Sequence, residues 1–292
     1  MAGFVAWLTG HRLRRVAFIA GMFPLPVTSV FSAAIVVLTA DLKGLEEALK
    51  DIALAFAGLG LMAVLSGSDP MPLLTSAALS WVIAALLGGV GHKYRSFTLV
   101  VQAALLLTIA GMVLFLLLVG DAEAFWKAWL QQAAADFVAE GVGELDQSLI
   151  DQLASFMTTG MAVSLLISSL IAVSIGSSWA CASRNESFGE RFRQLKLGYV
   201  IGGLAAALGL AALAGFETAG GMLIAVSIGF LLQGLAVLCS WAKHKSWPGS
   251  WWAAIIVPLV LLMVVPVPAI LIAFGLVAIG FIDNWYSLRP RT

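Results

Sequence analysis

The chain has 292 residues, of which 61% are apolar and only 11% are charged. A soluble domain carries roughly 25% charged residues, so this composition excludes an ordinary soluble protein and predicts one that lies in a lipid bilayer. Sixteen basic and sixteen acidic residues cancel, and this charge balance gives no indication of a nucleic-acid partner.

The apolar runs are continuous and do not alternate with period two. Backbone polar groups in lipid must be satisfied within each segment, so such runs predict transmembrane helices. We therefore predict an all-α polytopic bundle, with residues 1–292 forming a single transmembrane domain.

The first apolar run, 16–40, contains the sequence FPLPV with Pro24 and Pro26 two residues apart. Proline removes a backbone donor and clashes with the preceding turn, so the helix should break there. We predict two short helices, the first from Arg12 to Met22.

Eight further apolar segments follow, and the total is then ten membrane segments. They are 46–65, 72–90, 97–119, 157–180, 197–216, 221–241, 251–265 and 269–285.

The distribution of basic residues favours ten segments with both termini in the cytoplasm. This arrangement places fifteen of the sixteen lysines and arginines inside and leaves only Lys127 outside. A nine-span reading with its N-terminus outside places twelve inside. Cytoplasmic loops are enriched in basic residues, so we expect the ten-segment topology in a bacterial inner membrane.

The long polar insert 121–156 lies outside in this topology and carries seven acidic residues. Its apolar residues recur at helical spacing in two stretches, which predicts two amphipathic helices on the outer face. They form either a packed surface cap or a lid or docking site over an outer cavity.

Few polar side chains lie inside the predicted membrane segments. Gln102, Gln233, Asp283 and Asn284 all fall in the cytoplasmic half of these segments. Polar groups there are costly unless they face protein or water. Two interpretations stay open for the glutamines, an interhelical hydrogen bond or contact with a substrate or ion. For Asp283 we expect a pair with Arg289 or another base of the inner loops. The serines of segment 157–180 usually bond their own backbone and indicate packing.

Small residues repeat at intervals of four in two segments. The pairs are Ala53 with Ala57, Gly202 with Ala206, and Ala205 with Gly209. Such faces let helices approach closely, either within the chain or in a partner chain.

Nothing in the sequence predicts an enzyme. The three histidines, His11, His92 and His244, lie beside lysine or arginine at cytoplasmic ends, and no metal-binding or nucleophile motif accompanies them. We expect no catalytic residue, no metal and no cofactor.

The C-terminal third contains Gln233-Gly234, the basic turn with Lys243 and Lys245, and the ending GFIDNWYSLRPR. With Gly280, Asp283, Trp285 and Arg289 this ending matches G-x-x-D-x-W-x-x-x-R and resembles the YybS-like family of bacterial multi-pass membrane proteins. The Pro-broken N-terminal hairpin is also similar. That resemblance implies an organisation like the substrate-capturing subunits of vitamin and metal uptake systems, which work with a separate ATPase pair.

Two functions are therefore expected. The first is a transport-associated protein that binds a small solute within the bundle, with Gln102, Gln233 and Asp283 as polar contacts. The alternative is a non-catalytic scaffold or accessory subunit that holds a membrane partner through its small-residue faces and acidic insert.

Overall fold

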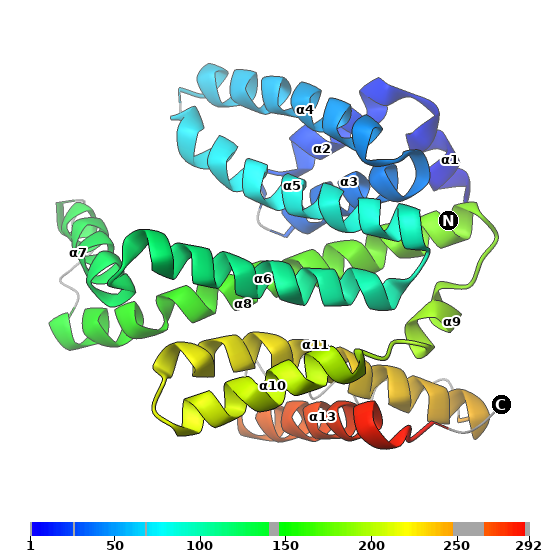
Figure 1. Cartoon of the computed structure of the whole chain (residues 1–292). Helices are drawn as coiled ribbons and strands as arrows, with labels where there is room; N and C mark the ends of the chain where they lie inside the picture. The colour runs from blue at the N-terminus through cyan, green and yellow to red at the C-terminus, as the bar shows by residue number, and fades with distance from the viewer. Residues whose placement is uncertain (1, 26, 68, 140–145, 248–265, 290–292) are drawn as a thin grey trace.

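The computed structural model describes residues 2–25, 27–67, 69–139, 146–247 and 266–289, and in this part of the chain every regular element is a helix (Figure 1). The helices of the first half are α1 (Ala2–Gly10), α2 (Arg12–Met22), α3 (Ser29–Lys43), α4 (Leu45–Leu65), α5 (Pro70–Tyr94), α6 (Phe97–Val119) and α7 (Ala122–Ala139). Those of the second half are α8 (Gln147–Ser183), α9 (Phe188–Arg193), α10 (Gly198–Leu213), α11 (Glu217–His244) and α13 (Pro266–Tyr286).

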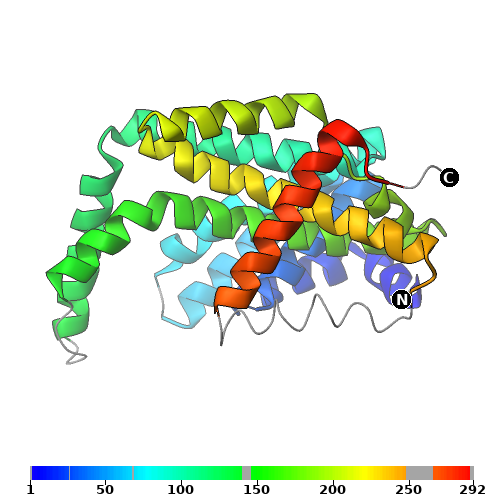
Figure 2. The same cartoon turned by 90° about the horizontal axis from the view of Figure 1, so that it is seen from below.

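The helices form three groups side by side. The long helices α6 and α8 run through the middle, α1 to α5 pack on one side of them, and α10, α11 and α13 pack on the other (Figure 1). The start of α1 and the end of α13 lie at one end of the bundle, whereas α7 lies at the opposite end (Figures 1 and 2). The end that holds α1 is called the terminal end below.

Five of the described helices, α4, α5, α6, α8 and α11, are long and apolar enough to cross a membrane. A rise of 1.5 Å per residue makes the shortest of them about 32 Å long, close to the ~30 Å of a hydrocarbon core. The other predicted segments are also helical in the described residues. Segment 251–265 lies outside the described residues. The apolar helix Gly198–Leu213 (α10) and the apolar stretch Ile270–Tyr286 of α13 are shorter.

The predicted break in the first apolar run is confirmed. Helix α2 has the predicted bounds and ends at Met22, and α3 begins at Ser29, so the chain turns between them. Both helices are shorter than the ~20 residues that span a bilayer. The additional short helix α1, before Arg12, was not predicted.

Helix α3 is the most enclosed element of the described bundle. Ten consecutive residues, 32–41, are buried, because α3 contacts α2, α4, α5 and α8. Two glycines permit this packing: a Cβ at Gly88 of α5 would lie 2.7 Å from the Ala40 side chain, and one at Gly176 of α8 would lie 2.6 Å from the Ala34 carbonyl oxygen. A larger residue at either position would push a neighbouring helix away from α3.

A fully buried tryptophan joins the helices around α3. The Trp81 indole N–H donates to the Ser32 hydroxyl over 2.9 Å, and that hydroxyl donates to the Ile19 carbonyl over 2.7 Å. The rings of Phe23 and Phe56 pack edge-on against the indole at 5.1 and 5.2 Å. The indole N–H and the Ser32 hydroxyl are thereby both paired inside an apolar surrounding, as burial requires.

The acidic insert differs from its prediction in one respect. Its first amphipathic helix is α7, but the second predicted helix is not separate: it is the first part of the 37-residue α8, which continues into the apolar segment 157–180. Residues 147–156 contain neither glycine nor proline to end the helix, and α8 packs against α7. An indole–hydroxyl bond between Trp126 and Thr158 (2.8 Å) and an ion pair between Lys127 and Asp151 (2.7 Å) hold the two helices together.

Candidate functional site

The three residues predicted as polar contacts come together at the start of α10. Gln102 of α6 donates to the Leu197 carbonyl over 2.7 Å, and Gln233 of α11 accepts from the Leu197 N–H over 2.9 Å. The Gln233 amide also donates to Asp283 of α13 over 2.9 Å. Gln102 and Gln233 thus bond to the same backbone position, and each forms the interhelical contact that was one of the two interpretations above.

Asp283 is fully buried and has several partners. Its Oδ2 pairs with Arg289 at 3.0 Å, as predicted, and its Oδ1 accepts from the Leu288 N–H at 2.9 Å. The Arg289 guanidinium also donates to the carbonyls of Arg193 and Leu195. The neighbouring Asn284 donates to and accepts from the Gly198 backbone. We call Gln102, Gln233, Asp283, Asn284 and Arg289 the C-terminal polar cluster.

The glycines of the C-terminal motif have a packing role beside this cluster. A Cβ at Gly234 would collide with the Leu276 carbonyl oxygen, and one at Gly280 would collide with the Phe230 carbonyl oxygen. Helices α11 and α13 therefore meet backbone to backbone, which brings Asp283 within reach of Gln233. Gln233, Gly234, Gly280, Asp283 and Arg289, which carry part of the resemblance, therefore build one structural unit, and the Gln233 amide bonds to the protein through both its oxygen and its nitrogen.

The small-residue faces behave differently from one another. Gly202 is buried against α13, where a Cβ would lie 2.6 Å from the Asn284 side chain, and Gly209 is half-buried near Leu223. Ala53, Ala57 and Ala206 are exposed on the surface of the bundle. The α10 face thus packs within the chain at Gly202 and Ala205, whereas the Ala53–Ala57 face of α4 is turned away from the rest of the bundle.

A buried ionic cluster joins α2 to α4, and the sequence analysis missed it. The Arg15 guanidinium donates to Asp51 at 2.6 and 3.2 Å, and Arg12 donates to the same carboxylate at 3.0 Å and to Glu47. Arg15 also donates to the Thr9 carbonyl at the end of α1. Asp51 is 0% exposed and Arg15 only 2%. The sequence signal that could have located this cluster is Asp51, an acidic residue inside the predicted segment 46–65. It lies near the end of that segment that was predicted to be on the same side of the membrane as Arg12 and Arg15.

A second missed contact joins α3 to α8. Arg184, just after α8, donates to both the carboxylate (3.0 Å) and the backbone carbonyl of Asp41, which is 1% exposed. The ring of His92, at the end of α5, lies 2.7 Å from the same carbonyl. These contacts, the Arg15–Asp51 pair and the C-terminal polar cluster all lie toward the terminal end of the bundle.

The half of the bundle nearer α7 contains an apolar groove. It lies between α5, α6 and α8, has a volume of about 780 Å³, and is bordered by Trp126 of α7. Binding sites for small molecules typically have ~300–1,000 Å³ and mostly apolar walls. Leucine, valine, isoleucine, alanine and methionine supply most of the lining, and none of the described lining residues is charged.

Few hydrogen-bonding groups face this groove. Thr108 donates to the Ala104 carbonyl, and Thr158 accepts from Trp126, so both hydroxyls already have partners. Ser169 is a third polar residue of the lining. Apolar residues that line the groove and apolar residues that face lipid look alike in a sequence, so no pattern predicted this site.

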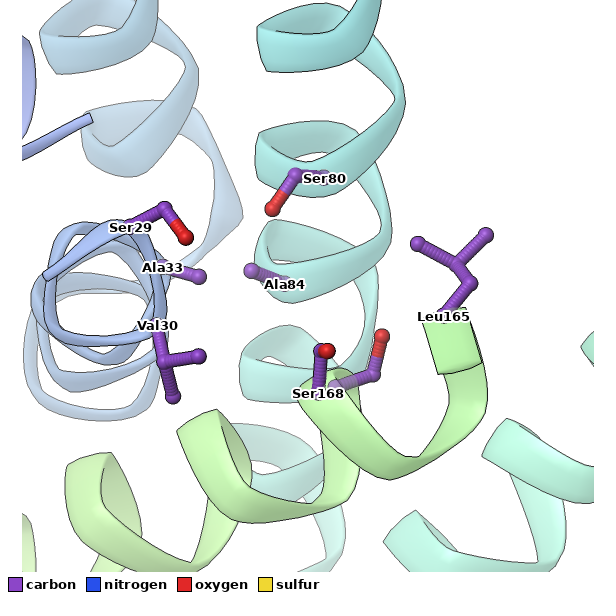
Figure 3. A pocket seen from close by; sticks show the side chains of 8 residues that line it. Ser29, Val30, Ala33, Ser80, Ala84, Leu165 and Ser168 are labelled. Carbon is purple, nitrogen blue, oxygen red and sulfur yellow. The ribbon is translucent and has the colours of Figure 1, made fainter. Parts of the chain in front are cut away.

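A small polar pocket adjoins the groove, where α3, α5 and α8 cross (Figure 3). Its volume is about 30 Å³, and four serines line it: Ser29, Ser80, Ser168 and Ser169. Figure 3 shows the Ser29 and Ser80 hydroxyls turned toward each other across the space between α3 and α5, with Ser168 approaching from α8. Leu165 and Ser169 border both the pocket and the groove.

Comparison of the chain with protein-family models, with curated proteins and with solved structures gives no match. The groove, the serine pocket and the polar clusters are therefore the observations that bear on function.

Proposed function

We propose that this protein binds an apolar or amphipathic small molecule in the groove between α5, α6 and α8, as a transport-associated protein of the bacterial inner membrane. The observation that carries the proposal is the apolar groove of about 780 Å³, which is large enough for a small ligand. It opens within the half of the bundle nearer α7 and involves helices from the middle and from one side of the fold.

The location of this groove changes which residues the proposal assigns to binding. Gln102, Gln233 and Asp283 were expected as ligand contacts, but their side chains bond to protein groups at the terminal end. A solute that displaced Gln233 would leave the Leu197 N–H without its partner, and such a loss costs about 1–3 kcal/mol. Binding in the groove needs no such displacement.

The proposal places the terminal end of the bundle in the cytoplasm. Its support is the distribution of lysine and arginine, fifteen of sixteen of which fall inside in the ten-segment topology. The groove then opens in the outer half of the membrane, and α7 lies outside. The resemblance to uptake subunits adds a separate ATPase or coupling subunit as the proposed partner.

Photolabelling with an apolar probe tests binding in the groove. The full chain, in lipid nanodiscs, is irradiated with a long-chain alkane that carries a diazirine, and the labelled peptides are identified by mass spectrometry. We expect label to concentrate on groove-facing peptides of α6 and α8. Gly111→Phe places a large ring in the groove and should reduce that label at least fivefold.

A matched control is available in the chain. Gly111 and Gly203 are both exposed helical glycines with open space at the Cβ position, but only Gly111 lines the groove. Gly203→Phe should leave the labelling of α6 and α8 unchanged. Equal labelling along every exposed helix, with no response to Gly111→Phe, would show ordinary contact with lipid and contradict the proposal.

The scaffold function is the second candidate, and the exposed Ala53–Ala57 face of α4 favours it. Small residues four apart let a helix of another protein approach closely in lipid. Affinity purification from native membranes, followed by mass spectrometry of the co-purified proteins, separates the two candidates. If Ala53→Leu removes a stoichiometric membrane partner and groove labelling is absent, the scaffold function is favoured.

A further inference from the structure

The serine pocket gives the groove a polar end. Leu165 and Ser169 border both spaces, so a molecule that fills the groove ends beside the hydroxyls of α5 and α8. Ligand sites commonly combine mostly apolar walls with a few polar groups that fix the orientation of the ligand. This inference rests on the proposed binding function and specifies the chemistry of the ligand.

The pocket serines differ from Ser174 and Ser227 in their hydrogen bonding. Ser174 donates to the Leu170 carbonyl and Ser227 to the Leu223 carbonyl, the usual way in which helical serines are satisfied in lipid. Ser80 of α5 and the pair Ser168 and Ser169 of α8 also lie within apolar helices. They have no hydrogen-bond partner among the residues that the structure describes. Their hydroxyls are available to a group that enters the pocket.

The size and charge of the pocket restrict that group. About 30 Å³ accommodates one or two water-sized groups, and a water-sized group needs ~10–15 Å³. No charged side chain occurs among its described lining residues, so an ionised head group would be buried without a counter-charge at high cost. A neutral oxygen that accepts or donates hydrogen bonds fits both restrictions, because serine hydroxyls do both.

We infer that the groove binds a neutral amphiphile, with its apolar body between α5, α6 and α8 and a single hydroxyl or carbonyl oxygen among Ser80, Ser168 and Ser169. Ser29, at the start of α3, forms the remaining wall of the pocket.

The experiment compares two photoactivatable probes of equal length on the full chain in nanodiscs. One is a long-chain primary alcohol and the other is the corresponding alkane, each with a diazirine at mid-chain. In the unaltered protein, the alcohol should label groove peptides about tenfold more strongly than the alkane does at equal concentration in the membrane. A tenfold ratio corresponds to about 1.4 kcal/mol.

The variant Ser80→Ala/Ser168→Ala removes two hydroxyls that bond to no described group, so its melting temperature should stay close to that of the unaltered protein. It should reduce labelling by the alcohol about tenfold, to the level of the alkane, and leave labelling by the alkane unchanged. Ser174→Ala, on the same helix as Ser168, removes a hydroxyl that bonds its own backbone and should change neither.

The outcomes separate this inference from the proposed function. If both probes label the groove equally and both respond to Gly111→Phe, the groove binds apolar molecules but the serine pocket holds only water, and the inference is wrong. The same conclusion follows if the double serine variant leaves labelling by the alcohol unchanged. If neither probe labels the groove above its level in Gly111→Phe, the proposed function fails as well.

Discussion

The terminal end of the bundle contains buried charged groups, whereas the half nearer α7 contains an apolar groove. At the terminal end, Asp41, Asp51 and Asp283 are almost fully buried, and each is paired with an arginine. Near α7, the large groove has almost no polar lining. Buried charges tie helices into one arrangement because a broken pair is costly, whereas apolar contacts let helices separate by small amounts. We therefore expect the terminal end to be rigid and the groove to tolerate substitution.

The largest expected effect is at the Arg15–Asp51 pair. Asp51→Ala leaves the buried Arg15 guanidinium without a carboxylate, and the loss of one partner of a buried pair costs about 3–5 kcal/mol. We expect the melting temperature in detergent to fall steeply, with α1 and α2 more open to proteolysis. The double variant Arg15→Met/Asp51→Leu should regain part of that loss. If Asp51→Ala melts like the unaltered protein, the ion pair does not stabilise this end.

The contact between α11 and α13 should show the next largest effect. Gly280→Ala places a Cβ against the Phe230 carbonyl oxygen, and forcing extra atoms into a close contact costs about 1–3 kcal/mol or more. Gly275→Ala on the same helix meets nothing within 4 Å and should be neutral or stabilising. Thermal unfolding of both variants measures the difference. Equal melting temperatures would mean that the two helices are not in backbone contact.

Gln233→Leu tests whether the C-terminal polar cluster is structural. It removes the acceptor of the Leu197 N–H and one donor to Asp283, and an unsatisfied buried group costs about 1–3 kcal/mol. The fold should lose stability while photolabelling of the groove persists. Ser227→Ala, also on α11, serves as the control. A stable Gln233→Leu protein that no longer binds ligand would return the solute site to this cluster.

The smallest effect should occur at the outer end, where Asp146 begins α8. Hydrogen bonds from the Ser148 hydroxyl and backbone N–H hold the pKa of this exposed carboxyl below its ordinary value. The carboxylate therefore supports the first turn of α8 at neutral pH, and the support is lost as the pH falls through the lowered pKa, below about pH 4. Amide exchange at Ser148–Ile150, corrected for intrinsic rates, should increase there. Asp146→Ala should show that faster exchange at all pH values.

The sequence predicted the helices well where a local signal existed. Two prolines located the turn after Met22, and apolar runs located the five long helices. The pairing of Asp283 with Arg289 also followed, because the two residues lie six positions apart at the end of one helix. The extent of α8 was wrong, since a helix continues through polar residues when its apolar face is covered by α7.

Contacts between residues far apart in the chain could not be predicted from such local signals. Asp51 with Arg15 and Arg184 with Asp41 join residues 36 and 143 positions apart, and many basic residues could equally have paired with either acid. The small-residue repeat on α4 resembled the one on α10, yet Gly202 and Ala205 of α10 are buried within the chain, whereas Ala53 and Ala57 of α4 are exposed.

The sequence by itself determined that this is an apolar helical protein, where its short hairpin breaks, and which few polar residues must find partners away from lipid. Composition and hydropathy act on each segment separately, so they are readable without a fold. Only the tertiary structure decided that Gln102 and Gln233 both bond to the Leu197 backbone, that Gln233 also bonds to Asp283, and that an apolar groove ends at four serines. Both features depend on which helix faces pack against each other. Close packing of the helices at Gly88, Gly176 and Gly280 determines those faces.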